Sequence, residues 1–273
     1  MQYQRVELPT LEGGSIPMDM YIPHVSEAID PHPRRTSVVI YPGGGYHFVS
    51  EREAEPVALR FAAAGFNTFV VWYRVAPQVR FPSPQQDAAS AIAYVRAHAE
   101  ELHCHPDRIA VLGFSAGGHL AGSMGVMWNR EELWSPLGLT ARQVRPNAMV
   151  LCYPVITGGE YAHRGSFECL SGSENLSDHT PFSLETLVTE QTPPTFLWHT
   201  WDDGSVPVEN TLLMAMALRR AGVQAEVHIF PHGSHGASLA DVTTTKVDDP
   251  SKLLPDCAEW PGMAVRFLRK VLG

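Results

Sequence analysis

Residues 113–117 read Gly-Phe-Ser-Ala-Gly, and they join an apolar run to a run of small residues. Arg108–Leu112 (Arg-Ile-Ala-Val-Leu) predicts a short buried strand, and Ala116–Val126, rich in Ala, Gly, Leu and Met, predicts a closely packed helix. Ser115 would then occupy a sharp strand-to-helix turn, where a Cβ on either flanking glycine would clash. Such a turn lifts the hydroxyl out of the sheet and points the free N–H groups of the helix at the same place.

Two interpretations fit this pattern. The spacing Gly-x-Ser-x-Gly also arises by chance, and a serine before a helix can serve only as its N-terminal cap. The strand before Ser115 and the helix after it are, however, the context that a nucleophile elbow requires. We therefore interpret Ser115 as the nucleophile of a serine hydrolase.

The rest of the chain alternates between strand-like and helix-like segments. An N-terminal hairpin is predicted, with its turn at Glu12-Gly13-Gly14. Its strands, and those that follow, are expected at Val6–Leu8, Ile16–Ile22, Thr36–Tyr41, Phe66–Tyr73, Ala148–Tyr153, Thr195–His199 and Ala225–Phe230; the other helices are expected over about residues 53–64, 83–99, 208–221 and 258–271. This order predicts a mostly parallel sheet with helices on both faces.

One interval is too long for a simple crossover. About forty residues separate Tyr153 from Thr195, and long loops in compact domains are usually functional. At this place in the order of strands, the interval would overhang the carboxyl ends of the sheet, where ligands bind. We expect residues 1–273 to form a single domain with a cap insertion at about 156–192.

Composition limits the classes of partner. A net charge of −9 argues against nucleic acid and anionic membrane surfaces, and no window is apolar enough to span a bilayer. No secretory signal is evident, and the four cysteines have no close pairing or metal spacing. We therefore expect free thiols and a cytoplasmic location, and leave open whether the chain forms a homo-oligomer.

A serine nucleophile needs a base, and the base needs an orienting acid. In the hydrolase arrangement the acid and then the histidine follow later strands. Asp203 follows the strand expected at 195–199, and His235 follows the strand expected at 225–230. Asp202 and His232 are the alternatives. The spacing Asp-x-x-Val-Pro favours Asp203, and the flanking Gly233 and Gly236 favour His235.

The oxyanion hole needs two backbone donors. One is expected to be the N–H of Ala116, and the other the N–H of Gly44 or Gly45, in the loop after the strand at 36–41. As a phosphate loop this stretch is weak, because no Lys-Ser/Thr follows it. No metal or organic cofactor is needed for this chemistry. His103-Cys104-His105 is best interpreted as a solvated loop, not a metal site.

Two aromatic residues are candidates for substrate binding. Tyr46 lies beside the expected oxyanion loop, and Trp201 lies beside the expected acid. Either could wall a small acyl pocket or stack on a sugar ring, and ordinary packing is the alternative for both.

With these residues placed, the sequence resembles the α/β-hydrolase superfamily, and within it the intracellular esterases related to acetyl esterases and acetylxylan esterases. The matching stretches are Ile40–Tyr46, Pro106–Val111, Gly113–His119, Pro194–Thr200, Asp203, Val206-Pro207 and His235-Gly236. Hormone-sensitive-lipase-like relatives carry His-Gly-Gly-Gly at the oxyanion loop, whereas here Tyr41-Pro42 precede the glycines. That departure points to the branch that resembles bacterial sugar acetyl esterases.

The resemblance implies hydrolysis of short O-acyl esters, acetylated sugars or xylo-oligosaccharides among them. An amide or formamide hydrolase and a peptidase-like serine hydrolase are the alternative enzymes. A binding protein on this scaffold is disfavoured, because such proteins typically lose a member of the triad and none is missing here.

Overall fold

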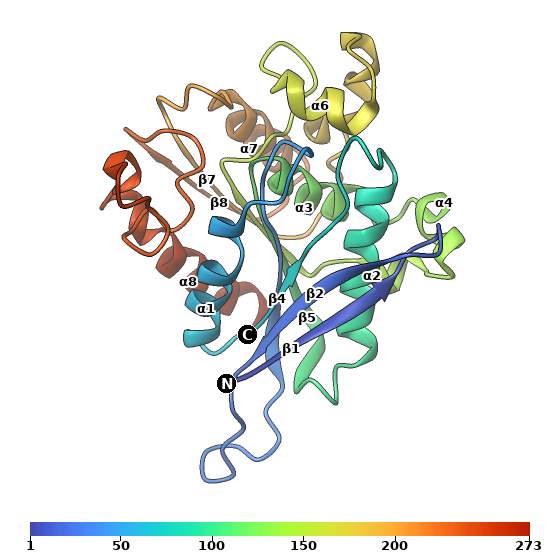
Figure 1. Cartoon of the computed structure of the whole chain (residues 1–273), viewed down its shortest axis with the longest axis vertical. Coiled ribbons are helices and arrows are strands. Elements are labelled where there is room, and N and C mark those ends of the chain that lie inside the picture. Colours follow the sequence, from blue (N-terminus) through green and yellow to red (C-terminus); the bar gives the residue numbers. More distant parts are fainter.

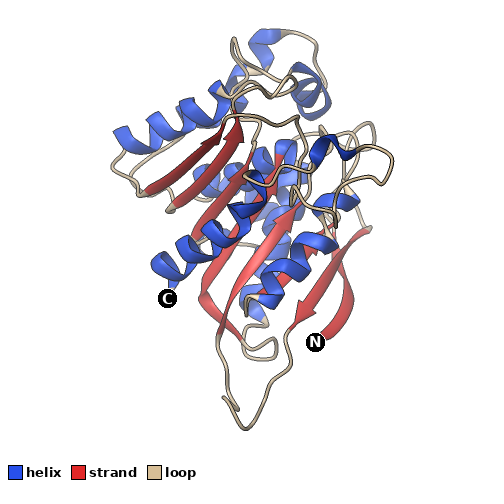
Figure 2. Ribbon diagram, turned by 90° about the vertical axis from the view of Figure 1, so that its left-hand side faces the viewer, coloured by secondary structure: helices blue, strands red, loops and turns tan.

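The computed structural model describes all 273 residues and contains one eight-stranded sheet. The strands lie side by side in the order β1-β2-β4-β3-β5-β6-β7-β8, with helices on either side (Figure 2). β1 and β2 form an antiparallel hairpin that pairs antiparallel with β4, and every other pairing is parallel. The strands are β1 (Gln2–Pro9), β2 (Ser15–Ile22), β3 (Arg35–Tyr41), β4 (Asn67–Val71), β5 (Cys104–Phe114), β6 (Ala148–Cys152), β7 (Thr195–Thr200) and β8 (Ala225–Phe230).

The helices form two layers, one on each face of the sheet. The helices are α1 (Glu55–Ala63), α2 (Ser83–Ala97), α3 (Ser115–Met127), α4 (Glu131–Trp134), α5 (Ala141–Val144), α6 (Arg164–Ser171), α7 (Glu209–Arg220) and α8 (Trp260–Leu272). α1 and α8 pack together on one face, and α2, α3 and α7 cover the other (Figure 1). The predicted arrangement of helices on both faces of a mostly parallel sheet is therefore confirmed.

Successive side chains of the central strands point to opposite faces of the sheet, and this explains why helices cover both faces. Val38 and Ile40 of β3 belong to the core under α1 and α8, whereas Val39 and Tyr41 belong to the core under α2 and α3. All four side chains are fully buried. A strand with apolar residues on both faces is stable only between two layers of helices, so these continuous apolar runs dictate a three-layer fold.

The structure differs from the sequence-based expectations mainly at boundaries. β5 begins at Cys104, four residues before its expected start, and Cys104 is buried beside Asn67, so the expectation of a solvated loop is wrong for this residue. The short helices α4 and α5 were not expected. Neither is long enough to show a helical period, so their sequences carry no clear signal. None of the helices is long and apolar enough to cross a membrane.

The interval between β6 and β7 folds into α6 and three short 3₁₀ turns. It lies at the end of the molecule above α3 (Figure 1). His119 of α3 fastens it, because its Nε2–H donates to the carbonyl oxygen of Phe182 at 2.9 Å. Phe167 of α6 packs edge-on against the same imidazole and stacks on His179. Side chains of the interval are thus anchored directly to the helix that follows the elbow.

The turn from β5 into α3 brings backbone segments into unusually close approach. Ser115 has a positive φ of 53°. A Cβ on Gly113 would lie 2.0 Å from the carbonyl oxygen of Gly117, and one on Gly117 would lie 2.1 Å from that of Tyr41. Because these obstacles are backbone atoms, they cannot move aside as a flexible side chain can. Glycine is therefore a steric requirement at both positions.

We expect Gly117→Ala to lower the free energy of unfolding by about 1–3 kcal/mol or more, since the added methyl overlaps the β3 backbone. Gly262→Ala in α8 is the matched control. Its methyl would meet only the side chain of Arg266 at 3.7 Å, so its stability should be unchanged or slightly raised. Urea unfolding of both variants measures the difference, and equal losses would contradict the steric explanation.

Candidate active site

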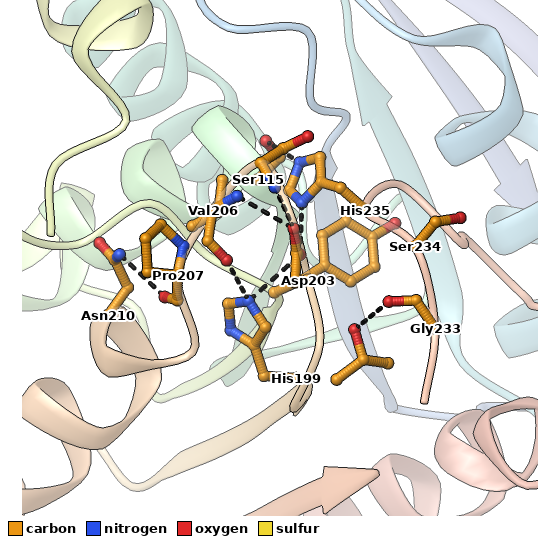
Figure 3. Close-up of polar contacts among 12 residues, drawn as sticks. Ser115, His199, Asp203, Val206, Pro207, Asn210, Gly233, Ser234 and His235 are labelled. Atoms are coloured by element: carbon orange, nitrogen blue, oxygen red, sulfur yellow. Dashed lines mark hydrogen bonds and ion pairs between the residues drawn. The ribbon is translucent and has the colours of Figure 1, made fainter. Parts of the chain in front are cut away.

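Three side chains from separate loops form a continuous hydrogen-bonded chain at the carboxyl edge of the sheet (Figure 3). His235 Nε2 accepts from the Ser115 hydroxyl at 2.8 Å, and its Nδ1–H donates to Asp203 Oδ2 at 2.7 Å. Asp203 fixes the tautomer of His235 with the proton on Nδ1, because a carboxylate can only accept a hydrogen bond. The structure therefore brings together the serine, histidine and aspartate singled out in the sequence.

Asp203 is held in place by more than the histidine. Its Oδ1 accepts from the backbone N–H groups of Ser205 at 2.8 Å and Val206 at 3.0 Å. Burial alone raises the pKa of Asp203, but hydrogen bonds from His199 and His235 outweigh it and hold the pKa well below its usual range. The carboxylate is therefore charged, fixed and aimed at His235.

A second buried histidine, His199, supports Asp203 from the other side (Figure 3). Its Nε2–H faces the carbonyl oxygen of Val206 at 3.0 Å and Asp203 Oδ2 at 3.3 Å. Its Nδ1 accepts from the hydroxyl of Thr211 at 2.8 Å. The sequence did not single out His199, because it ends a predicted strand like many core residues. Its position four residues before Asp203 was the one available signal.

The two alternative residues form a separate pair at the surface. Asp202 Oδ2 accepts from His232 Nδ1 at 3.0 Å, and Asp202 Oδ1 accepts from the N–H of Gly233 at 2.7 Å. The His232 side chain is 83% exposed and makes no contact with Ser115. Asp202 thus ties the loop after β8 to the loop after β7, and the choice of Asp203 and His235 agrees with the geometry.

The glycine loop after β3 presents free backbone donors to the same site. The N–H of Gly43 donates to Glu53 Oε2 at 2.7 Å and is occupied. The N–H groups of Gly44 and Gly45 donate to no protein group. Ala116 lies in the first turn of α3, where backbone N–H groups have no partner within the helix. The donors expected at Gly44, Gly45 and Ala116 are therefore available to a ligand.

Glu53 is a further buried residue at the site. Its carboxylate is buried and accepts from the N–H of Gly43 and from the hydroxyl of Tyr153, the latter at 2.7 Å. Tyr153 also accepts from the N–H of Ser238 at 2.8 Å, and its ring packs edge-on against His235. One carboxylate thus connects the glycine loop to the wall behind the imidazole. No sequence signal marked it, because an acidic residue before a helix is commonplace.

The two aromatic candidates for substrate binding are not at the cavity, which corrects that expectation. Tyr46 is buried, and its hydroxyl donates to His119 Nδ1 at 2.9 Å. Burial lowers the pKa of His119 to about 4, so the imidazole is neutral. It accepts from Tyr46 at Nδ1 and donates from Nε2 to Phe182, in the interval above α3. Trp201 is 64% exposed and lies outside the cavity. The ring of Tyr46 is packed in the core, and the turn after β7 directs the ring of Trp201 to solvent.

The cavity beside Ser115 has a volume of about 430 Å³. Most of its lining residues are polar residues or glycines, with Phe48 as an exposed aromatic ring and His163 contributed by the interval before α6. His163 Nδ1 pairs with the hydroxyl of Ser166 at 2.8 Å. Burial and the neighbouring charge of His235 lower the pKa of His163. No cluster of three or more His, Cys, Asp or Glu side chains is placed to hold a metal ion.

Comparison with known proteins assigns the family. The family model described as BD-FAE matches residues 18–218. The chain belongs to the BD-FAE family. A crystal structure of an acetyl ester-xyloside bifunctional hydrolase from Caldicellulosiruptor lactoaceticus is 39% identical, with a TM-score of 0.79, and the match covers 94% of this chain and 88% of that one. The predicted α/β-hydrolase fold and the resemblance to acetyl esterase-like proteins are confirmed.

Two curated relatives in this comparison are longer proteins. The endo-1,4-beta-xylanase B of Butyrivibrio fibrisolvens is 35% identical over 212 residues, which are 76% of this chain and 33% of that protein. The acetylxylan esterase of Xylanibacter ruminicola is 32% identical over 236 residues, which are 84% of this chain and 46% of that protein. The chain therefore spans between a third and a half of these relatives.

We expect His199→Phe to lower stability at pH 7 by about 1–3 kcal/mol, because it removes a buried donor to Asp203. A depressed carboxyl pKa contributes stability above its unfolded value of about 3.9, and this stability is lost as the pH falls through the folded pKa. The variant, with a smaller depression, should therefore lose less stability between pH 5 and pH 3 than the wild type.

Urea unfolding across this pH range measures both effects. His232→Phe is the matched control, since His232 is exposed and contacts Asp202 instead. Its effect should stay within about 0.5 kcal/mol, as for most surface substitutions. An unchanged acid slope in His199→Phe would contradict the support of Asp203 by His199.

Proposed function

We propose that this protein is a serine carboxylic-ester hydrolase that removes short acyl groups, acetyl first among them, from small esters. The observation that carries the proposal is the continuous chain from Ser115 through His235 to Asp203, beside a loop with free backbone donors. Acetylated sugars or xylo-oligosaccharides are the proposed substrates. The names of the related acetylxylan esterase and acetyl ester-xyloside hydrolase support this class.

The proposed reaction is a two-step acyl transfer. His235 Nε2 takes the proton of Ser115 as its oxygen attacks the ester carbonyl, and Asp203 holds and stabilises the imidazolium. The oxyanion is stabilised by the N–H of Ala116 and by that of Gly44 or Gly45. His235 then returns the proton to the alcohol, which leaves behind an acyl-serine. Water, deprotonated by His235, releases the acid and regenerates the hydroxyl.

The surroundings of the triad suit a polar alcohol. The cavity offers polar side chains and one exposed aromatic ring, Phe48, a combination that allows hydrogen bonds to hydroxyl groups and contact with the apolar face of a sugar. We also propose that residues 156–192 act as a cap in a single domain of residues 1–273, since His163, Gly165 and Cys169 line the cavity. A cytoplasmic location is proposed from the four free thiols.

A series of p-nitrophenyl esters from acetate to decanoate tests the reaction and its acyl preference. We expect activity to be greatest on acetate, to be present on acetylated xylo-oligosaccharides, and to fall by about 10⁶-fold in Ser115→Ala. Retention of more than about a thousandth of the activity in Ser115→Ala would rule out Ser115 as the nucleophile. Hydrolysis of amide or formamide substrates instead of esters would replace the proposal with the alternative enzymes.

Adjacent aspartates offer an internal control for the role of the acid. Asp203→Asn should lower kcat by about 10³–10⁴-fold, because an amide no longer selects the productive tautomer of His235. Asp202→Asn keeps an oxygen acceptor for the N–H of Gly233 and lies outside the triad, so its kcat should stay within about tenfold of the wild type. Steady-state kinetics on p-nitrophenyl acetate decide between them, and the reverse order would assign the acid to Asp202.

A further inference from the structure

One cationic side chain in the cavity has no partner within the protein. Arg52 lies in the short 3₁₀ helix Glu51–Glu53, between the glycine loop and α1, and lines the cavity beside Ser115. Its backbone is fixed, because the hydroxyl of Ser238 donates to its carbonyl oxygen at 2.6 Å. Its guanidinium makes no hydrogen bond and no ion pair, in contrast to Arg5 and Arg74, which both bind carboxylates. The donors of Arg52 are therefore free for a ligand.

The guanidinium lies on the histidine side of the cavity, next to a second cation. A Cβ built on Gly236 would be 3.5 Å from Arg52 Nη2 and 3.9 Å from Lys252 Nζ. The Lys252 ammonium donates to the carbonyl oxygen of His235 and to the hydroxyl of Ser234, the latter at 3.2 Å. Two positive groups thus converge on the residue that follows His235.

No acidic group pairs with either cation. Glu53 accepts from the N–H of Gly43 and from the hydroxyl of Tyr153. Asp203 accepts from His235 and from backbone N–H groups. Asp249 accepts from the N–H of Ser251, and its charge reaches Lys252 only at longer range. Burial and the charge of Arg52 lower the pKa of Lys252. The two cations therefore repel each other, and an anion placed between them would relieve the repulsion.

The position of Arg52 indicates which half of an ester it would contact. In the proposed reaction His235 returns its proton to the oxygen of the departing alcohol, so the alcohol lies on the histidine side of Ser115. Arg52 is beside Gly236 on that same side. A guanidinium presents a planar fork of donors that matches a carboxylate in a bidentate pair.

We propose that Arg52 binds a carboxylate on the alcohol half of the substrate, with Lys252 adding a second positive charge nearby. For a carbohydrate ester, such a group is a uronic acid next to the acylated sugar. The inference rests on the proposed esterase function and names a narrower substrate class for the same cavity. Arg52 is a specificity residue in this scheme, because its contact distinguishes charged from neutral alcohols.

A matched pair of substrates tests the proposal. 4-Acetoxybenzoate and 4-acetoxybenzamide release the same acetyl group and differ in one charge at the far end of the alcohol. We expect kcat/KM to favour the carboxylate, and sodium chloride to weaken the preference. In Arg52→Gln the ratio of the two kcat/KM values should fall about ten- to a hundredfold, mainly through KM for the carboxylate.

Arg34→Gln supplies the control with the same change in net charge. Arg34 is exposed in the loop before β3, at the opposite end of that strand from the glycine loop, and should leave the ratio unchanged. Equal kcat/KM values on the two substrates in the wild type would overturn the proposal. So would a uniform loss on both substrates in Arg52→Gln, since it would assign Arg52 a structural role.

Direct binding separates this proposal from the proposed esterase function. Ser115→Ala can be titrated by calorimetry with xylotriose carrying a glucuronic acid branch and with unbranched xylotriose. The branched sugar should bind about tenfold more tightly, and this advantage should disappear when Arg52→Gln is added. Equal binding of the two sugars overturns the carboxylate site, whether or not esters are hydrolysed. Absence of Ser115-dependent hydrolysis of p-nitrophenyl acetate overturns only the esterase function.

Discussion

The active-site geometry depends on the close approach of the β3 loop to the turn between β5 and α3. Gly117 lies so close to the β3 loop that a methyl group would be 2.1 Å from the carbonyl oxygen of Tyr41 and 2.4 Å from that of Pro42. A Cβ on Gly43, on the other side of this contact, would lie 2.8 Å from the carbonyl oxygen of Phe114. This contact sets the distance between Ser115 and the free N–H groups of the glycine loop. Backbone packing thereby holds the proposed nucleophile close to the proposed oxyanion donors.

Buried polar side chains hold the remaining loops against this contact. Glu53 joins the glycine loop to Tyr153, His119 joins Tyr46 to the interval above α3, and His199 joins β7 to Asp203. Each is buried and satisfied, so the cost of removing it from water is met by hydrogen bonds. Loops that carry reacting groups need such anchors, because they lack the ladder of hydrogen bonds that fixes a strand. These contacts restrain the loops that carry the candidate site.

The sequence predicted the parts of the site that follow from chain order. Ser115, Asp203 and His235 were identified because each follows a predicted strand, and the carboxyl ends of parallel strands meet at one edge. The roles of Glu53 and His119 were not predicted, because they rest on contacts between segments far apart in the sequence, and the role of His199 was missed although it lies four residues before Asp203. Tyr46 was misplaced for the same reason: proximity to the glycine loop in sequence did not reveal that its hydroxyl faces His119. The order of strands and motifs was enough to predict which residues reach the site. The direction of individual side chains was not predictable, because it depends on tertiary packing.

Charge is divided across the cavity in a way that suits ester hydrolysis. Asp203 accepts from the Nδ1–H of His235, and Glu53 accepts from Tyr153, whose ring packs edge-on against the same imidazole. The cations Arg52 and Lys252 lie beside Gly236, the residue that follows His235. In the proposed reaction Asp203 stabilises the imidazolium of His235, whereas in the proposed recognition Arg52 and Lys252 supply positive charge, so the two proposals assign groups of opposite charge to two separate tasks beside one histidine.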